Sequence, residues 1–379
     1  MGEAITLRGM TWDHSRGVDP MRATSAAYAK SHPGVEITWE KRSLQAFADR
    51  PIGEMTAAYD LMVIDHPHVG EVAFSGNLVA FDALCRDADL ATLAAQSVGL
   101  SHPSYNFGGH QWGLAIDAAT PVASFRPDLI DAAPKSWDGV MALANAGKAA
   151  LALIPINTLM TFFGLAQNLR YDVAENPDAL MDRSHAEEVL GHVGELAAKV
   201  DQRCLTLDPI GVLEWMGRTK DAPAYCPFGY GYTNYSRDGY CEFPIIFANA
   251  PGFGDNGPRG TVIGGTGIAI SSQCKHIDVA ADYAFWIAGA DWQTGLYFES
   301  GGQPGNAVAW QADTTNAQCR NFFHNTRETL ETAWLRPRYN GYMGFQERGG
   351  NILHAFLRGE TSKIATLDRL DAAYRESRT

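Results

Sequence analysis

The sequence predicts an α/β fold with parallel-type sheets flanked by helices, and three observations support this class. Short apolar runs of strand length alternate with longer segments of helical periodicity along most of the 379 residues. Several of these runs end abruptly in polar residues, which is typical of strand ends that face a ligand. Finally, a chain of this length exceeds what one hydrophobic core normally organises, so two domains are expected.

The clearest strand is Leu61–Ile64, a run of four apolar residues that suits a strand buried on both faces. Asp65, His66 and Pro67 follow it directly. Proline cannot extend a central strand, but it fits the first turn of a helix. The segment therefore predicts a buried parallel strand whose carboxyl end delivers Asp65 and His66 into a loop, with a helix starting near Pro67.

The elements before this strand follow a strand–helix rhythm. They are a strand at 5–10, a helix at 19–30 capped by Asp19, an alternating strand at 35–39 and a short helix through Phe47 capped by Ser43. Polar residues follow the first strand at Trp12–Gly17. This order is typical of a parallel sheet with helices on its faces.

The remaining chain predicts a second α/β unit between about 120 and 255, and then a return to strand and helix patterns. The expected elements are strands at 111–116 and 151–154, a strand-like stretch at 261–270, helices at 136–145, 158–169, 186–200 and 279–287, and a helix that starts at Asp208-Pro209 and carries Trp215. The last 60 residues predict helices interrupted at 336–342.

Composition excludes several classes of function. The net charge of −13 and the lack of a long Lys/Arg run argue against nonspecific binding to nucleic acid. No run approaches the roughly 18 apolar residues of a membrane span. The first residues, Met1 to Ile5, lack the basic start and apolar core of a signal peptide. The sequence therefore leaves two expectations: a cytoplasmic protein, or an exported one whose leader has been removed.

The six cysteines contain no C-x-x-C pair, which argues against a structural zinc site. Cys226 and Cys241 flank a stretch rich in glycine and tyrosine that could fold back and join them. A disulfide between these two residues and buried free thiols both remain open, the thiols being the simpler interpretation.

Several motifs, taken in order, resemble a known family. They are Trp12-Asp-His-Ser-Arg-Gly17, His32-Pro-Gly-Val-Glu-Ile37, Tyr59-Asp-Leu to His66, Gly264-Gly-Thr-Gly-Ile-Ala-Ile270 and a late helix ending in Gly301-Gly-Gln-Pro304. Together they look like the family-1 extracellular solute-binding proteins of ABC importers, typified by sugar receptors. The likeness covers nearly the whole chain.

The resemblance implies a two-lobe, type II periplasmic-binding-protein fold with a ligand cleft at the hinge. Residues 1–117 plus 260–312 would form lobe one, and 118–259 plus 313–379 would form lobe two. Such a protein would be a monomer, periplasmic or extracellular, without cofactor, metal or enzymatic activity. It would close over a sugar, polyol or sugar acid and deliver that ligand to the transmembrane permease.

Sugar recognition needs flat aromatic faces and a few fixed polar groups in a concave site. The chain offers such groups at strand ends, on the glycine–tyrosine stretch, on glycine turns whose backbone N–H groups would be available to ligand oxygens, and on the late segment. The candidate ligand-binding residues are Trp12, His14, Arg16, Asp65, His66, Trp215, Tyr230, Tyr232, Gly265, Gly301, Gly302, Arg336 and Tyr339. Each also has a structural alternative: helix capping, core packing, an ion pair or bracing of the hinge.

Two other functions remain open. An enzyme acting on glycans would use a carboxylate pair such as Asp65 and Asp117 as acid and base. A receptor for iron or another anion would use the tyrosines and His66. A metal site at Asp65, His66 and His68 is disfavoured, because no further His or Cys motif stands ready to complete it.

Overall fold

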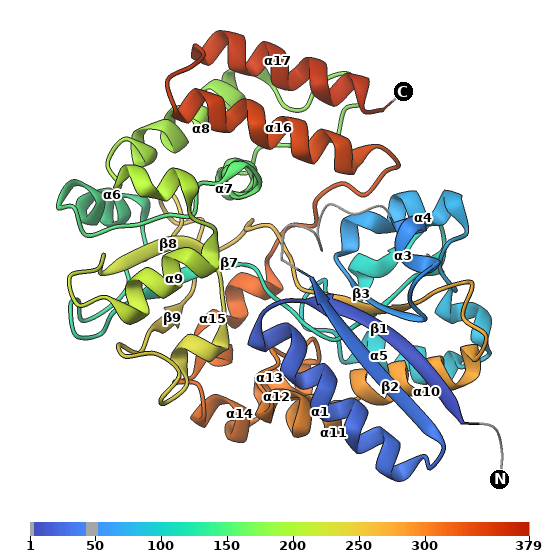
Figure 1. Ribbon diagram of the computed structural model, residues 1–379. Helices are drawn as coiled ribbons and strands as arrows, with labels where there is room; N and C mark the ends of the chain where they lie inside the picture. Colours follow the sequence, from blue (N-terminus) through green and yellow to red (C-terminus); the bar gives the residue numbers. More distant parts are fainter. Residues whose placement is uncertain (1–3, 43–51, 379) are drawn as a thin grey trace. The chain divides into compact units, whose positions relative to one another are not determined.

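A computed structural model describes residues 4–42 and 52–378. The expected short helix after Ser43 lies outside these residues. The chain divides into two compact units, the first formed by Met1–Ala118 and Gly264–Thr315 and the second by Ala119–Ile263 and Asn316–Thr379. The α/β class predicted from the sequence is confirmed (Figure 1).

Unit 1 contains a five-stranded sheet in the order β2-β1-β3-β10-β6. Its strands are β1 (Ile5–Trp12), β2 (Val35–Arg42), β3 (Leu61–Ile64), β6 (Leu114–Ala115) and β10 (Gly267–Ile270), and a hairpin pairs β4 (Asn106–Phe107) with β5 (His110–Gln111). β1 is parallel to β2 and to β3, whereas β10 is antiparallel to both β3 and β6. The sheet is therefore mixed.

Helices surround this sheet. They are α1 (Ser15–Ser31), α3 (Ile52–Thr56), η1 (His66–His68), α4 (Val69–Ser75), η2 (Phe81–Leu84), α5 (Asp87–Ala95), η3 (Pro103–Tyr105), α10 (Ile277–Ala288), α11 (Ala290–Thr294), α12 (Leu296–Glu299) and α13 (Ala307–Gln311), with α14 (Asp313–Ala317) at the boundary of the unit. All four residues of β3 are buried, so the expected central strand is confirmed. Its side chains join the core cluster of this unit, together with β1, β10 and the inner face of α10.

Helix α1 begins earlier than the sequence predicted. His14, rather than Asp19, is the N-cap, and its Nδ1 accepts the backbone N–H of Arg16 at 3.0 Å. Pro20 consequently lies inside the helix and not at its first position. The rule for Asp-Pro starts failed here because a histidine, which is not a preferred cap, satisfied the first turn instead.

Unit 2 has a three-stranded sheet in the order β8-β7-β9, formed by β7 (Pro121–Phe125), β8 (Tyr225–Tyr230) and β9 (Ile246–Ala248). All its pairings are antiparallel, which differs from the parallel sheet expected. Its helices are α6 (Trp137–Asn145), α7 (Pro155–Asn168), α8 (Arg183–Ala197), η4 (Gln202–Thr206), α9 (Pro209–Arg218), η5 (Thr233–Ser236), α15 (Phe322–Glu331), α16 (Tyr342–Leu357) and α17 (Lys363–Glu376).

Two predicted strands do not form as expected. The buried segment 151–154 is not a strand: its backbone bonds reach Cys204 and Leu207 outside any ladder. The 111–116 segment is divided between β5 and β6 because its two ends pair with different partners. In both cases the apolar run correctly indicated burial but not the identity of the pairing partner.

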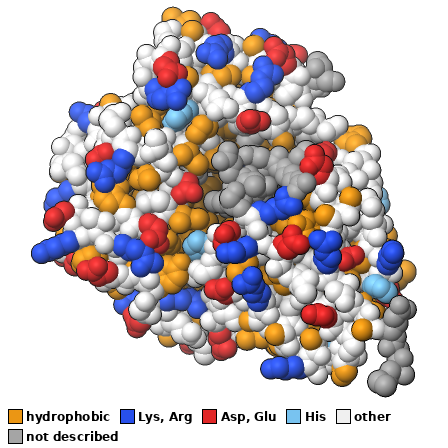
Figure 2. All heavy atoms as spheres, viewed as in Figure 1, with side chains coloured by type: hydrophobic (Ala, Val, Ile, Leu, Met, Phe, Trp, Pro, Cys, Tyr) orange, Lys and Arg blue, Asp and Glu red, His pale blue; other side chains and the backbone are white. Residues whose placement is uncertain are grey.

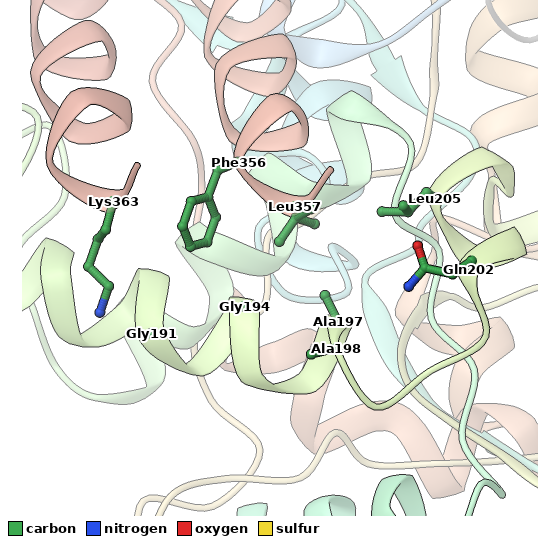
Figure 3. A pocket seen from close by; sticks show the side chains of 9 residues that line it. All are labelled: Gly191, Gly194, Ala197, Ala198, Gln202, Leu205, Phe356, Leu357 and Lys363. Carbon is green, nitrogen blue, oxygen red and sulfur yellow. The ribbon is translucent and has the colours of Figure 1, made fainter. Parts of the chain in front are cut away.

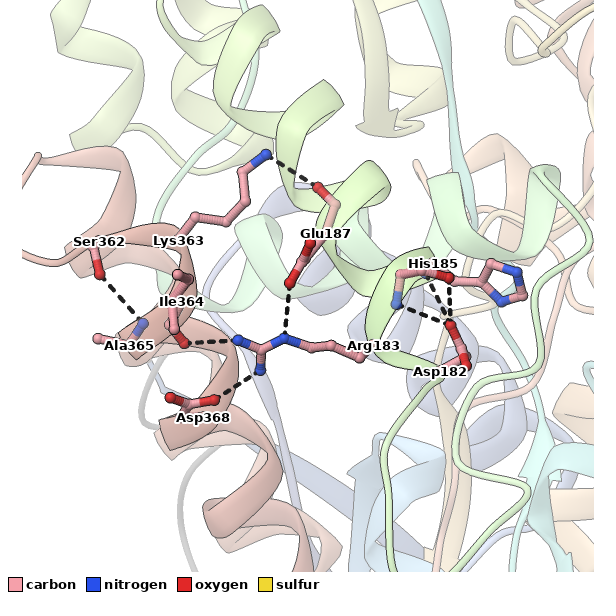
Figure 4. A network of polar contacts seen from close by, with 10 residues as sticks. Asp182, Arg183, His185, Glu187, Ser362, Lys363, Ile364, Ala365 and Asp368 are labelled. Carbon is pink, nitrogen blue, oxygen red and sulfur yellow. Dashed lines mark hydrogen bonds and ion pairs between the residues drawn. The ribbon is translucent and has the colours of Figure 1, made fainter.

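Within unit 2, polar side chains connect α8 to α17, the last helix of the chain (Figure 4). The guanidinium of Arg183 pairs with Glu187 on its own helix and with Asp368 on α17, at 3.0 and 2.8 Å. The Nζ of Lys363 donates to the backbone oxygen of Glu187 at 3.2 Å. These charges are about half exposed, so we expect them to set the helix orientation more than the stability.

The described surface is mixed in charge. On the face shown in Figure 2, acidic and basic side chains are interspersed, and no single-sign patch covers the described part of that face. Among the described residues, no helix is both long and apolar enough to cross a membrane. All six cysteines are free thiols, and Cys226 and Cys241 are buried, so the structure favours the thiol alternative for this pair.

Candidate functional site

One edge of the unit 1 sheet collects most of the side chains that the sequence singled out. β1 and β3 are parallel and therefore end at the same edge. β10 runs in the opposite direction, so it begins at this edge, and β6, antiparallel to β10, ends there. We call this the carboxyl edge of unit 1. It brings together the predicted residues around Trp12, Asp65 and Gly265.

Asp65 and His66 lie directly after β3, as predicted. The Oδ1 of Asp65 accepts the backbone N–H of His66 at 2.8 Å and so caps the 3₁₀ turn. His66 is fully buried, its Nδ1 lies 3.2 Å from the same carboxylate oxygen, and its ring contacts Tyr105 edge-on. Asp65 itself keeps about a quarter of its side chain exposed. The capping alternative thus applies to Asp65.

Trp12 ends β1, and His14 and Arg16 follow it, but Trp12 and Arg16 are buried. Trp12 is 4% exposed and its indole packs directly on Gly17, where an added Cβ would come within 2.4 Å of the ring. Arg16 is 3% exposed. His14 is partly buried and caps α1. The packing alternative therefore holds for Trp12 in this structure.

A buried ion pair occupies the same edge. The guanidinium of Arg16 forms two bonds with the carboxylate of Asp117, Nε to Oδ2 at 2.7 Å and Nη2 to Oδ1 at 2.5 Å. Burial raises the pKa of Asp117, and the Arg16 guanidinium opposes that rise. Such a fork-to-carboxylate geometry fixes both side chains. It joins the start of α1 to the end of β6, and the sequence had suggested Asp117 only as a catalytic candidate.

Gly265 and Gly302 occupy positions at this edge where a side chain would not fit. Gly265 has φ +97°, and a Cβ would lie 2.3 Å from the backbone oxygen of Asp117. At Gly302 a Cβ would lie 2.3 Å from the Tyr297 ring. Both positions thus let the backbone lie close to another backbone segment or to a ring of the same unit.

The turn at Gly301 and Gly302 differs from the expectation in one respect. The N–H of Gly301 donates to the carbonyl of Phe298 at 2.9 Å, and the N–H of Gly302 donates to Tyr297 at 3.0 Å. These N–H groups close the end of α12. They are therefore not available to ligand oxygens, whereas the sequence had led us to expect that they would be. The next residue, Gln303, is fully buried and donates its amide to the Ala118 carbonyl. Sequence reasoning missed this glutamine, although it directly follows the glycine motif.

The remaining candidates lie in unit 2, and two of them are brought close through Val262. The hydroxyl of Tyr230, at the end of β8, donates to the Val262 carbonyl at 3.1 Å. Val262 also bridges to Trp334, two residues before Arg336. Arg336 is 4% exposed, and its Nη1 donates to Gln346 Oε1 at 2.8 Å. Buried arginines with side-chain partners hold their position well, which suits either a binding or a bracing role.

Tyr232, Trp215 and Tyr339 each contact a neighbouring side chain of unit 2. Tyr232 is 6% exposed and lies edge-on to the ring of Tyr235. The indole of Trp215, on α9, is covered by the guanidinium of Arg203 at 4.1 Å. The hydroxyl of Tyr339 bonds Ser377 Oγ at 2.7 Å, at the end of the chain. Whether any of these touches a ligand stays a prediction.

A separate cavity of about 430 Å³ lies in unit 2 between α8 and the end of α16 (Figure 3). Phe356 points toward Gly194, where an added Cβ would meet the phenyl ring at 3.0 Å. Its lining residues are not among the predicted ones. Among the described residues, no group of three or more His, Cys, Asp and Glu side chains is placed to hold a metal ion.

Comparison with known proteins identifies the fold. The structure is similar to maltose-bound MalE3 of T. maritima, with a TM-score of 0.82 and 13% identity over 98% of this chain and 100% of that one. It is also similar to ABC-transporter solute-binding proteins of Agrobacterium radiobacter K84, with ribitol (TM-score 0.79, 16% identity, 99% of both chains), and of Thermotoga lettingae TMO, with tagatose (0.82, 15%, 98% and 99%). The chain therefore has the fold of ABC-transporter solute-binding proteins. No protein-family model and no curated protein matches its sequence.

Proposed function

We propose that this protein is the solute-binding component of an ABC importer and captures a carbohydrate or related polyol. The observation that carries the proposal is the fold, which the three similar solved structures share over 98–99% of this chain. Those proteins are described with maltose, ribitol or tagatose, which are all neutral molecules rich in hydroxyl groups. Sugar acids are included in the proposal because the chain carries arginines near the candidate residues.

The proposed mechanism is binding without chemistry. The bound ligand shifts an equilibrium toward a closed form that the permease recognises. No nucleophile or proton shuttle is required, so we propose that the protein is not an enzyme. It acts as a monomer outside the cytoplasm, in the periplasm or on the cell exterior.

A thermal-shift panel tests the proposal. A ligand that binds only the folded protein must raise its melting temperature, by an amount that grows with the ratio of free ligand to Kd. We expect one or more neutral sugars, polyols or sugar acids to raise it and to bind with a micromolar or tighter Kd, about −8 kcal/mol or better. A panel that spans mono- and oligosaccharides, polyols and uronic acids and yields no shift would contradict the proposal.

Site variants locate the binding. Asp65→Asn keeps an oxygen that can accept the His66 N–H, so the cap survives while the charge is lost. We expect the Kd for the best panel ligand to rise about tenfold to a hundredfold, because a hydrogen bond to a charged group contributes about 1.5–3 kcal/mol. Asp138→Asn, at an exposed position in the first turn of α6, is the matched control and should leave the Kd unchanged.

A further inference from the structure

A groove of about 440 Å³ lies in unit 1 between α5 and the α10–α11 corner. It is lined by Arg86, Asp89, Leu93 and Gln96 on or beside α5, and by Asp282, Phe285 and Trp286 on α10. Asp291 and Trp292 of α11 form its end wall. None of these residues is among the candidate ligand-binding residues, so the groove is independent of the proposed solute site.

Aromatic rings form the floor and end of the groove. The indoles of Trp286 and Trp292 contact each other, with ring centroids 3.7 Å apart and planes inclined by 32°. Behind them, Trp286 packs on Tyr28 and Tyr283. Both tryptophans remain partly exposed although they stand on a well-packed aromatic base. An indole face open to solvent in a groove is the preferred surface for a cation or an apolar stem.

The net negative charge of the groove favours a cation over an uncharged apolar ligand. One arginine and three aspartates line it, which gives a formal charge of 1 − 3 = −2. Arg86 pairs with Asp89 and Asp282, at 2.6 and 3.2 Å. Asp291 is exposed beside Trp292, and within the described residues no basic side chain pairs with it. A negative potential therefore remains at the tryptophan end.

The carboxyl ends of α5 and α10 add to the negative potential at the tryptophan end of the groove. The Arg86–Asp282 pair joins the beginning of α5 to α10, whereas the amide of Asn306 bonds both Gln96, after the end of α5, and the Ala288 carbonyl at the end of α10. The two helices consequently run in the same direction, and both carboxyl ends point to the Trp292 side. Helix carboxyl ends carry partial negative charge and favour cations.

The groove already holds one cation of the chain itself. The guanidinium of Arg86 lies between two carboxylates and 4.3 Å from the centroid of the Phe285 ring. The pair of Asp291 and Trp292 repeats this combination of carboxylate and aromatic face at the other end of the groove, and no Lys or Arg of the described residues pairs with Asp291 there. From this repetition we propose that the groove is a second binding site, for a small organic cation with a guanidinium or ammonium head and a short alkyl stem.

N-Butylguanidinium and its neutral analogue N-butylurea test this proposal on the full-length protein. The readout is the indole N–H signals of Trp286 and Trp292 in two-dimensional NMR, assigned with single Trp→Phe variants. We expect the cation to shift both signals in a saturable way with a Kd at or below the millimolar range, at least about tenfold tighter than the urea, and to weaken as salt is added. Equal shifts by both compounds, or larger shifts by neutral sugars, would overturn it.

Variants separate the site from a general effect of charge. Asp291→Asn changes an exposed side chain and should weaken the cation about threefold to tenfold, and Trp292→Leu should weaken it further. Asp87→Asn removes the same charge from an exposed position on α5 that does not line the groove, and should change the Kd less than about twofold. If Asp87→Asn weakened binding as much as Asp291→Asn, the ligand would respond only to the net charge and the assignment would fail.

Discussion

The buried Arg16–Asp117 pair should be among the most sensitive points of unit 1. Arg16→Met preserves much of the side-chain volume but removes both bonds to Asp117, whose side chain is fully buried. A carboxylate left without its cation in such a place destabilises a protein by about 3–5 kcal/mol. We therefore expect the free energy of unfolding to fall by that amount at neutral pH.

Equilibrium unfolding in urea measures this change, with Arg8→Met as the matched control. Arg8 pairs with Glu40 at 3.2 Å, but both side chains are more than half exposed, so its loss should cost at most about 1 kcal/mol. Both variants remove one positive charge from unit 1. The comparison therefore isolates the effect of burial from the effect of net charge.

The stability loss caused by Arg16→Met should also depend on pH. Burial already raises the pKa of Asp117, and loss of the Arg16 guanidinium removes the group that lowers it. In Arg16→Met the folded carboxyl then holds its proton to a higher pH than the unfolded one, so the penalty is largest at high pH and shrinks as pH falls. A loss no greater than that of Arg8→Met, or a penalty that grows toward acid pH, would refute the reasoning.

Two further stability predictions follow. Burial lowers the pKa of His102 to about 4 from its usual 6.5, so the unfolded chain binds the proton first. The free energy of unfolding should therefore fall by about 3 kcal/mol between pH 6.5 and 4. His102→Gln should flatten the plot of stability against pH in this range, and an unchanged slope would contradict the prediction. In chemical unfolding, Gly265→Ala should destabilise the protein by at least about 2 kcal/mol more than Gly34→Ala. Both glycines have φ near +98°, but of the two only Gly265 has backbone atoms within 3 Å of an added Cβ. Equal losses of stability would exclude this close approach as the cause.

Local signals in the sequence predicted much of the fold. Leu61–Ile64, Ser136 and Asp208 each determine an element through their immediate neighbours, as a buried apolar run or as helix caps. The start of α1 could not be predicted in this way, because the cap is a histidine. The 151–154 segment was interpreted as a strand because burial alone does not identify a hydrogen-bonding partner.

The candidate site was predictable only in part. The rule that polar residues after strand ends meet at one edge placed Asp65 and Trp12 together correctly, because it depends on topology alone. It did not show that Arg16 would be buried against Asp117, because 101 residues separate them along the chain. Nor did it show that the N–H groups of Gly301 and Gly302 close their own helix end. Local motifs thus indicate where functional groups gather, whereas tertiary contacts decide which of them remain available.

Native mass spectrometry of the purified protein, before and after incubation with a mixture of sugars, polyols and sugar acids, tests the central claim most directly. The account predicts a complex of one protein with one such molecule, and release of that molecule with its mass unchanged. If no member of the mixture is retained, or if the released molecule is hydrolysed or otherwise altered, a receptor that only carries its ligand is contradicted.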